Sequence, residues 1–484
     1  MESHNYDMLV IGGGPGGMAA AELAAVNRLR VCVINDGPLL GDGIEGAFKS
    51  KSLFEIARHH AYFKMRPDVF GPAPNLNFGA IAGSIQSGAV GLRLLRKERD
   101  GVLGIDVIEG RGQFVDDHTV LVGEVRYSAP HIIVATGTRP RVFSGIEVDG
   151  KHILTSDHVG NLEELPGAML VLGAGVIGCE YASMFGELGC HVTLIDTQPQ
   201  IMPHEDEDLS NFLTKAYEYS GITVLDSCRS KEMVVKDGRV HTLLSSGQTV
   251  VSDVAVLAVG RIPNLEGLDL AAAGVDVDKS GYIAVDEVMR TNISHIYAVG
   301  DIGYRNVPID MSLVHVAEAE GRCAALSILG RNPTLSMQHV PFIIFTLPMI
   351  AGAGMNERMA RDEYGDSIRI GKYPYGRNHR AHAMHTPIGF VKLIVAPEGN
   401  DRVLGVRAIG RDSDSIVGTV SIMIDNNLPY SYLLDSIQPH PSLSESLQGA
   451  AHIIHGDLLG YQPGEEDDYL RRRNVPKLDR RIFD

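Results

Sequence analysis

The feature that most constrains this chain is a repeated pattern of strand, glycine turn, helix and strand. The stretch DMLVIGGGPGGMAAAELAAVNRLRVCVIND (7–36) places an apolar run, a glycine-rich turn, an Ala-rich run and a second apolar run in that order. AMLVLGAGVIGCEYASMFGELGCHVTLID (168–196) repeats the order. One G-x-G-x-x-G is weak evidence, but two copies, each between a strand and a helix, predict two dinucleotide-binding folds.

The glycines of each copy have distinct physical tasks. The first permits a tight turn, the second lets the backbone approach a pyrophosphate, and the third lets helix and strand pack closely. The helix N-terminus then offers free N–H groups and its dipole to the phosphates. The glycines that we assign to cofactor binding are Gly12, Gly14 and Gly17 in the first copy and Gly173, Gly175 and Gly178 in the second.

The second strand of such a fold ends in an acid that binds the ribose hydroxyls of the adenosine. In the second copy this residue is Asp196. In the first copy the equivalent position is Asn35, with Asp36 next to it, so either side chain is a candidate. Asp196 repels a 2′-phosphate and the next residues, Thr197 and Gln198, supply no arginine, which favours NADH over NADPH.

Three further stretches repeat an apolar strand that ends in a glycine turn: HIIVATGTRP (131–140), VAVLAVGRIPN (254–264) and HIYAVGDIG (295–303). This order predicts that the second dinucleotide-binding fold is inserted into the first. The turns add candidate cofactor-binding residues, namely Thr136, Gly137, Gly260, Gly300 and Asp301.

Charge and composition exclude several classes of function. The net charge of -17 argues against a nucleic-acid partner. The five cysteines include no C-x-x-C pair and read as reduced core residues. The start, MESHNYD, has no signal-peptide pattern, and the apolar stretch 340–355 is short and broken by two prolines. We therefore expect a cytoplasmic protein with no transmembrane segment, and we predict no metal site.

These motifs, together with LGAGVIGCEYAS, HVAEAEG, GFVKLIV and HPSLSE, resemble the two-dinucleotide-binding flavoproteins of the pyridine nucleotide-disulfide oxidoreductase family. The chain looks like dihydrolipoamide dehydrogenase and soluble transhydrogenase from about residue 5 to 455. The resemblance implies FAD on the first fold, NAD(P)H on the second and a homodimer formed by the C-terminal domain. It also implies that Asp301 binds the ribityl and phosphate region of the flavin.

The predicted fold class is α/β, with two nested Rossmann-like domains and a C-terminal α+β dimerisation domain. We assign residues 1–155 and 285–335 to the FAD-binding domain and 156–284 to the NAD(P)H-binding domain. Residues 336–456 form the predicted dimerisation domain, and 457–484 form a polar C-terminal extension.

The chain departs from the family where the redox-active cysteine pair is expected. Family members carry two cysteines, separated by four residues and followed closely by Pro-Ser-Lys. Aligning the Ser-Lys with Ser50-Lys51 in GDGIEGAFKSKSL (41–53) puts Asp42 and Ala47 at the two cysteine positions. Neither side chain can form a disulfide or a thiolate. The resemblance therefore predicts a member of this family without its dithiol.

Four other residues of the family's catalytic pattern are present. Lys51 matches the lysine near flavin N5, and Glu180 matches the glutamate paired with it. HPSLSE supplies His440 and Glu445 at the spacing of the acid–base pair that, in the family, reaches across the dimer to the thiols. Without thiols, this pair either protonates another acceptor or persists as a structural hydrogen bond at the dimer interface.

The leading hypothesis is an FAD-dependent oxidoreductase that passes electrons from NADH directly to a non-disulfide acceptor. A quinone, a second nicotinamide nucleotide or a redox protein would serve. The first alternative is a component of a larger complex, as dihydrolipoamide dehydrogenase is. The second is a catalytically silent flavoprotein that responds to NADH.

Overall fold

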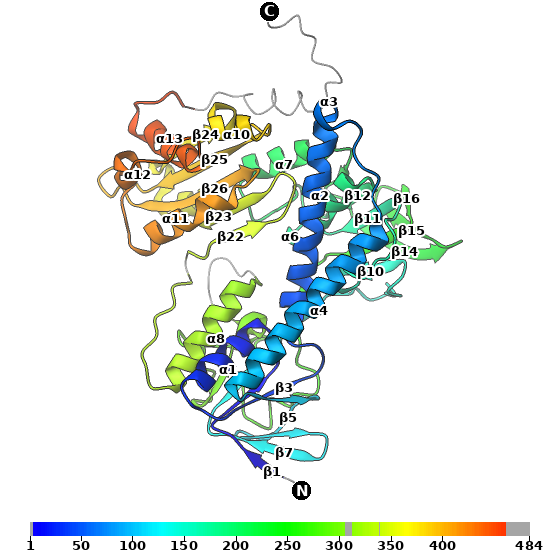
Figure 1. Ribbon diagram of the computed structural model, residues 1–484, viewed down its shortest axis with the longest axis vertical. Helices are drawn as coiled ribbons and strands as arrows, with labels where there is room; N and C mark the ends of the chain where they lie inside the picture. Colours follow the sequence, from blue (N-terminus) through cyan, green and yellow to red (C-terminus); the bar gives the residue numbers. More distant parts are fainter. Residues whose placement is uncertain (1–2, 305–311, 338, 461–484) are drawn as a thin grey trace, which may run out of the picture.

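The structure, a computed structural model, describes residues 3–304, 312–337 and 339–460 (Figure 1). Three sheets of five strands organise the molecule. The N-terminal parallel sheet has the strand order β20-β8-β2-β3-β4. Its strands are β2 (Met8–Ile11), β3 (Val31–Asn35), β4 (Asp106–Glu109), β8 (Ile132–Val134) and β20 (Ile296–Ala298).

The second parallel sheet has the order β10-β17-β11-β12-β13. Its strands are β10 (Ile153–Thr155), β11 (Ala168–Leu172), β12 (His191–Ile195), β13 (Thr223–Leu225) and β17 (Val254–Leu257). Because β20 returns to the N-terminal sheet after this sheet is complete, the second fold is nested within the first. The boundaries that we place at residues 156, 285 and 336 stay predictions.

The predicted glycine turns lead into helices that pack on these sheets. Helix α1 (Pro15–Val26) follows β2 and helix α6 (Val176–Leu188) follows β11. Both are rich in small or apolar residues and largely buried, since each packs against its sheet and other elements. Gly321 of α8 (Val314–Ile328) allows α1 and α8 to approach closely, because a Cβ there would lie 2.0 Å from the carbonyl oxygen of Gly16.

The C-terminal sheet is antiparallel, with the order β22-β23-β26-β25-β24. Its strands are β22 (Phe342–Ile344), β23 (Ile350–Gly354), β24 (Arg369–Pro374), β25 (Gly389–Val395) and β26 (Val403–Gly410). Helix α11 (Asp414–Asp425) packs on β23 and β26, and α13 (Ser444–His455) packs on β24 and β25. The fold class predicted from the sequence is confirmed.

Smaller elements complete the two nested folds. The first carries the sheet β1-β7-β6-β5, and the second carries the antiparallel sheet β14-β15-β16. Their strands are β1 (Ser3–Asn5), β5 (Gln113–Asp116), β6 (Thr119–Val122), β7 (Val125–Ser128), β14 (Ser230–Lys236), β15 (Arg239–Leu244) and β16 (Thr249–Ser252). Two long helices, α2 (Lys49–Met65) and α4 (Phe78–Leu103), run between the folds (Figure 1).

A buried ion cluster joins the second nested fold to the C-terminal sheet. Lys392 of β25 is 1% exposed, and its Nζ lies 2.8 Å from Asp206, 2.7 Å from Asp208 and 3.1 Å from Glu357. Beside it, Arg407 of β26 is fully buried and donates to Glu205 at 2.7 Å. Because such charges are costly to bury unpaired, the cluster fixes how these two parts of the chain meet.

One described helix is long and apolar enough to cross a membrane by length and composition, although a single such helix is weak evidence. It is α4, and only 17% of its most apolar stretch is buried. Leu94, Leu95 and Val102 are among its exposed side chains. The apolar stretch 340–355, which is too short and too interrupted to predict a membrane span, contains β22 and β23. Most of the predicted extension, residues 461–484, lies outside the described part.

Candidate functional site

The two glycine turns have the shape that a dinucleotide requires. Gly12 and Gly173 adopt φ values of +107° and +104°, where side chains are strained. A Cβ on Gly178, the third residue of α6, would lie 1.8 Å from the carbonyl oxygen of Gly173, so only a glycine lets the first turn of the helix pack against the glycine turn. A Cβ on Gly175 would meet nothing within 4 Å, which leaves the turn open to a phosphate. The predicted glycines therefore form two open cradles at helix N-termini.

Asn35 and Asp196 occupy equivalent places in the two folds. Oδ1 of Asn35 accepts the Gly13 N–H at 2.7 Å, and Oδ2 of Asp196 accepts the Ala174 N–H at 2.6 Å. Each side chain thus braces the glycine turn from the end of the second strand. Asp36 points elsewhere and pairs with Arg111 at 2.5 Å. Of the two candidates that the sequence left open, the structure puts Asn35 in the position equivalent to Asp196.

Lys51 and Glu180 meet between the nested folds and the C-terminal domain. Nζ of Lys51, on α2, lies 2.9 Å from Oε2 and 3.2 Å from Oε1 of Glu180, on α6. Oε1 of Glu180 also accepts the Phe345 N–H at 2.9 Å, and the Lys51 ammonium lies 4.8 Å from the centre of the Phe345 ring. Glu180 is 7% exposed and Lys51 33%. Lys51 is therefore held by a buried partner, and its role toward flavin stays a prediction.

Lys49, two residues before Lys51, is a buried lysine. Lys49 is 4% exposed, and its Nζ lies 2.8 Å from Glu45 and 3.0 Å from Asn161. Burial lowers the pKa of Lys49. No motif in the sequence pointed to Lys49.

The two strand ends ATGTRP and AVGRIPN form a small antiparallel ribbon. Strand β9 (Thr138–Pro140) pairs with β18 (Arg261–Pro263). The Arg261 guanidinium donates to the hydroxyl of Thr138 at 2.7 Å, and that hydroxyl donates to Asp301 at 3.1 Å. Thr136 and Asn264 exchange hydrogen bonds of 2.9 Å across the same ribbon. Gly137, Gly260 and Gly300 are all at turns with positive φ.

Asp42, at the first expected cysteine position, joins this network. Its carboxylate pairs with the guanidinium of Arg261, just before the π-helix η1 (Gly43–Phe48) that carries Ala47. Desolvation raises the pKa of Asp42, with further contributions from Asp157 and Asp301, and Arg261 opposes it. Sequence reasoning placed Asp42 but missed Arg261. An arginine and a proline follow the glycine turn at both strand ends, and this shared feature was the signal that could have found it.

The second pair, His440 and Glu445, lies in the C-terminal domain. Nδ1 of His440 lies 2.7 Å from Oε1 of Glu445, and Oε2 of Glu445 accepts the Ser442 N–H at 2.8 Å. His440 is 60% exposed. Within the described part of a single chain, no hydrogen bond or ion pair joins this pair to Lys51 or Glu180.

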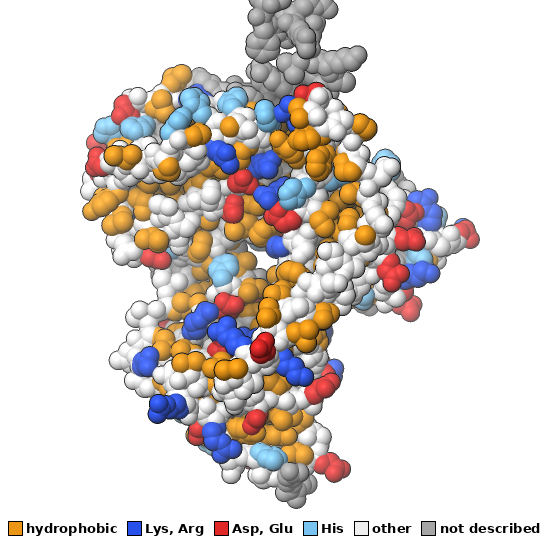
Figure 2. All heavy atoms as spheres, viewed as in Figure 1, with side chains coloured by type: hydrophobic (Ala, Val, Ile, Leu, Met, Phe, Trp, Pro, Cys, Tyr) orange, Lys and Arg blue, Asp and Glu red, His pale blue; other side chains and the backbone are white. Residues whose placement is uncertain are grey.

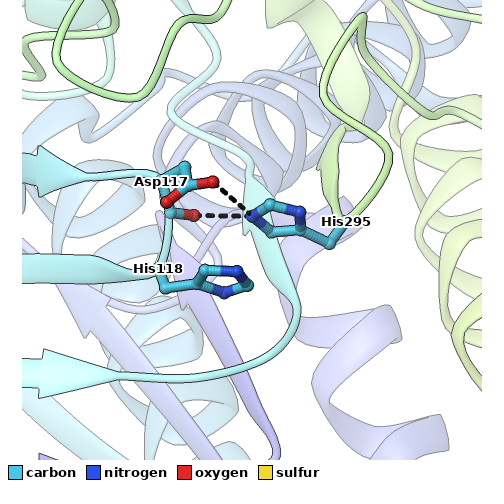
Figure 3. A group of neighbouring side chains, drawn as sticks. All are labelled: Asp117, His118 and His295. Atoms are coloured by element: carbon cyan, nitrogen blue, oxygen red, sulfur yellow. Dashed lines mark hydrogen bonds and ion pairs between the residues drawn. The ribbon is translucent and has the colours of Figure 1, made fainter.

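One group of side chains has the composition of a metal site, although the sequence predicts none. Asp117, His118 and His295 place possible ligand atoms within 4.8 Å of one another (Figure 3). The two imidazoles are stacked, with centroids 3.9 Å apart and planes inclined by 7°. Nε2 of His295 is also held by the Asp117 carbonyl at 2.9 Å. Parallel rings direct their lone pairs side by side, so binding one ion would require the rings to rotate.

The fold and the two glycine cradles define a protein with two dinucleotide-binding folds. The chain belongs to the pyridine nucleotide-disulphide oxidoreductase family, whose profile matches residues 6–321. The dimerisation domain of this family matches residues 340–451. FAD and NAD(P) are the cofactors of this family, and the second match indicates a homodimer.

Individual relatives agree with this assignment. The chain is 35% identical to a dihydrolipoyl dehydrogenase of Bacillus subtilis over 92% of this chain and 97% of that one. It is 32% identical to that of Thermus scotoductus, over 94% and 98%. Among solved structures, the flavoprotein disulfide reductase RclA of Escherichia coli superposes with a TM-score of 0.84 at 26% identity, covering 93% of this chain and 100% of that one.

Proposed function

We propose that this protein oxidises NADH through bound FAD and passes the electrons directly to an acceptor other than a disulfide. A quinone, a second nicotinamide nucleotide or a redox protein would serve. The observation that carries the proposal is the pair of residues at the expected cysteine positions. Asp42 is ion-paired with Arg261, and Ala47 lies in η1. Neither can take up the electrons of a reduced flavin.

The cysteines elsewhere do not replace that pair. All five are free thiols, and every one except the half-buried Cys228 is buried. Cys179 lies near the start of α6, and Cys190 lies just past its end. Eleven residues at 1.5 Å each separate them by about 16 Å, far beyond the ~7 Å between α-carbons that a disulfide allows. Burial also raises the pKa of Cys190 to about 12, which opposes thiolate formation.

The residues present fit both cofactors. Gly12, Gly14 and Gly17 would hold the FAD pyrophosphate at the start of α1, with Asp301 near the ribityl chain. Gly173, Gly175 and Gly178 would hold that of NADH at the start of α6, with Asp196 at the ribose. When bound, FAD takes a hydride from the nicotinamide and can release the electrons singly or in pairs. Lys51 supplies positive charge beside the flavin, and Glu180 keeps that charge positioned and paired.

A second candidate is a dihydrolipoyl dehydrogenase that serves a larger complex. The relatives favour it, because several proteins of that name are at least 30% identical to this chain over nearly their whole length. They support this candidate more strongly than they support direct transfer to a non-disulfide acceptor. The residues at positions 42 and 47 oppose it, since the dithiol chemistry of the family requires cysteine at both.

Steady-state oxidation of NADH against a panel of acceptors tests the proposal. The panel contains a water-soluble benzoquinone, a thionicotinamide nucleotide, ferricyanide, lipoamide and oxygen. We expect turnover with the quinone or the nucleotide, and none with lipoamide above the protein-free control. Lipoamide as the best acceptor would establish the second candidate. A flavin that NADH does not reduce would indicate a silent, NADH-responsive protein.

A further inference from the structure

A third imidazole stands beside the His440–Glu445 pair. His379 is the first residue of α10 (His379–Ala383), and its Nδ1 lies 3.4 Å from Nε2 of His440. The two rings meet edge to face, with centroids 5.2 Å apart and planes inclined by 78°. Figure 2 shows histidine side chains gathered over this part of the C-terminal domain. The contact is therefore a feature of an exposed, histidine-rich surface.

The start of α10 is tied to the loop that carries His440. Asn378 is 2% exposed, and its Oδ1 caps α10 by accepting the Ala381 N–H at 3.0 Å. Its Nδ2 donates to the Ser442 carbonyl at 2.9 Å and to the Ser446 hydroxyl at 2.8 Å. Because Asn378 precedes His379 and Ser442 follows His440 by two residues, these bonds fix the position of His379 relative to His440.

The hydrogen bonds of the pair determine which nitrogen of His440 is free. Burial raises the pKa of Glu445, but hydrogen bonds from His440 and from the Ser442 N–H outweigh this and leave the pKa below its ordinary value. Glu445 is therefore a carboxylate at neutral pH, and Nδ1 of His440 carries the proton between them. Nε2 is then the nitrogen of His440 that can exchange a proton, and it faces His379.

We propose that Glu445, His440 and His379 form a proton relay, and that Nε2 of His379 delivers the proton to the electron acceptor. This inference rests on the proposed function. In the charged state, both nitrogens of His440 carry protons, and Nε2–H donates to Nδ1 of His379. His379 then carries its own proton on Nε2, which points away from the pair.

The step balances when the acceptor is a quinone. The quinone receives two electrons and one proton as a hydride equivalent and becomes the hydroquinone anion. That anion takes the proton from Nε2 of His379, and the proton on Nε2 of His440 moves to Nδ1 of His379. Both imidazoles end neutral, Glu445 stays ionised, and solvent returns one proton before the next turnover. NADH, the quinone and one proton thus give NAD⁺ and the hydroquinone.

Charged and titratable side chains surround this pair of histidines. Among the described residues, Glu445 on α13 interacts with both His440 and His379. Tyr373 on β24 interacts with Glu445 and with Arg377, which lies in the turn after β24. The 3.4 Å separation is longer than an ordinary hydrogen bond. Catalytic hydrogen bonds are often long in the free enzyme and shorten when substrate binds.

Stopped-flow reoxidation of the NADH-reduced dimer tests the relay. The reduced protein is mixed without oxygen with a water-soluble benzoquinone or with ferricyanide, which needs no proton. The readout is the rate of reoxidation by the quinone divided by the rate of reoxidation by ferricyanide, measured between pH 6 and pH 9. The variants are His379→Ala, which removes the imidazole, and His379→Asn, whose amide oxygen keeps an acceptor for the Nε2–H of His440 but cannot relay a proton. His382→Gln is the matched control, because His382 lies on the same helix and bonds the Gly376 carbonyl at 2.7 Å.

We expect both His379 variants to lower the ratio at least tenfold and to flatten its dependence on pH. Added imidazole should restore the ratio in His379→Ala, and His382→Gln should match the wild type. A wild-type ratio in His379→Ala would overturn the relay, and so would full recovery in His379→Asn, which would make His379 a positioning residue only. If no quinone reoxidises the wild type, the relay fails, whereas the proposed function fails only if the nicotinamide nucleotide and redox-protein acceptors also leave the flavin reduced.

Discussion

The ammonium of Lys51 lies 2.9 Å from Oε2 of Glu180, and a backbone N–H from the C-terminal domain, that of Phe345, binds the same carboxylate. One ion pair thus joins α2, α6 and the loop between β22 and β23. Since α2 starts just past the expected cysteine positions, the pair stands where we expect nicotinamide and flavin to meet. A positive charge held there stabilises the negative charge of a reduced flavin.

Lys51→Met should slow reduction of the flavin by NADH about tenfold or more, equivalent to ~1.4 kcal/mol. It should also destabilise the protein, because Glu180 is left as a buried, unpaired carboxylate. The double variant Lys51→Met/Glu180→Gln should regain stability without regaining rate. Stopped-flow absorbance and urea unfolding measure the two effects separately. Lys64→Ala, at the exposed end of the same helix, is the control, and equal slowing in it would contradict a specific role for Lys51.

Asp196→Asn should narrow the preference for NADH over NADPH. Asparagine can still accept the Ala174 N–H, as Asn35 accepts that of Gly13, so the glycine turn stays braced while the negative charge is lost. We expect a shift of up to tenfold in the ratio of kcat/KM values, about 1.4 kcal/mol. Adding Thr197→Arg should extend the shift. If the wild type already prefers NADPH over NADH tenfold, Asp196 does not exclude the 2′-phosphate and this interpretation is wrong.

His440→Ala should leave reduction by NADH near the wild-type rate and slow reoxidation by a quinone by ~10²–10⁴-fold, the usual contribution of general acid–base groups. Reoxidation by ferricyanide should change little, because it needs no proton. If the pair is instead a structural contact at the dimer interface, the variant should dissociate or unfold at a lower temperature than the wild type. Its reoxidation rates per folded dimer should then equal those of the wild type. Sedimentation distinguishes these cases. Equal slowing with both acceptors in an intact dimer would exclude proton delivery.

Lys392→Met should destabilise the protein at pH 7.5 by ~3–5 kcal/mol, because it leaves several carboxylates close together without their buried cation. The loss should shrink toward pH 4.5. Burial raises the pKa of Asp208, but Lys392 and Lys372 outweigh it and leave the pKa below its ordinary value. That stabilisation is present above the unfolded pKa of ~3.9 and disappears as the pH falls through the folded pKa. In the variant, protonation of the crowded carboxylates relieves their mutual repulsion, so the loss of stability becomes smaller as the pH falls.

Urea unfolding of the wild type and of Lys392→Met at both pH values measures the difference in the free energy of unfolding. A difference that grows toward low pH would contradict this explanation.

The sequence predicted the architecture because its decisive signals are local. The glycine turns need particular residues at fixed spacings, so the two nested folds and the position of Asp196 could be located from the pattern alone. The pattern left Asn35 and Asp36 as alternatives and did not indicate that Asn35 and Asp196 brace the glycine turns. The partner of Lys51 was also found, through the resemblance to the family. What the sequence could not provide were contacts between residues far apart in the chain. Arg261 contacts Asp42, which is 219 positions away in the sequence, and His379 contacts His440, which is 61 positions away. Contacts over such separations leave no local pattern in the sequence.

The spectrum of the protein during anaerobic titration with NADH tests the central claim most directly. We predict that the flavin bleaches without the long-wavelength band of a thiolate–flavin complex. The variant Asp42→Cys/Ala47→Cys is the matched positive control, since it restores cysteines at both family positions and should gain that band together with activity toward lipoamide. A wild-type protein that shows the band and reduces lipoamide would contradict the account, because a redox-active dithiol would then exist among its five native cysteines.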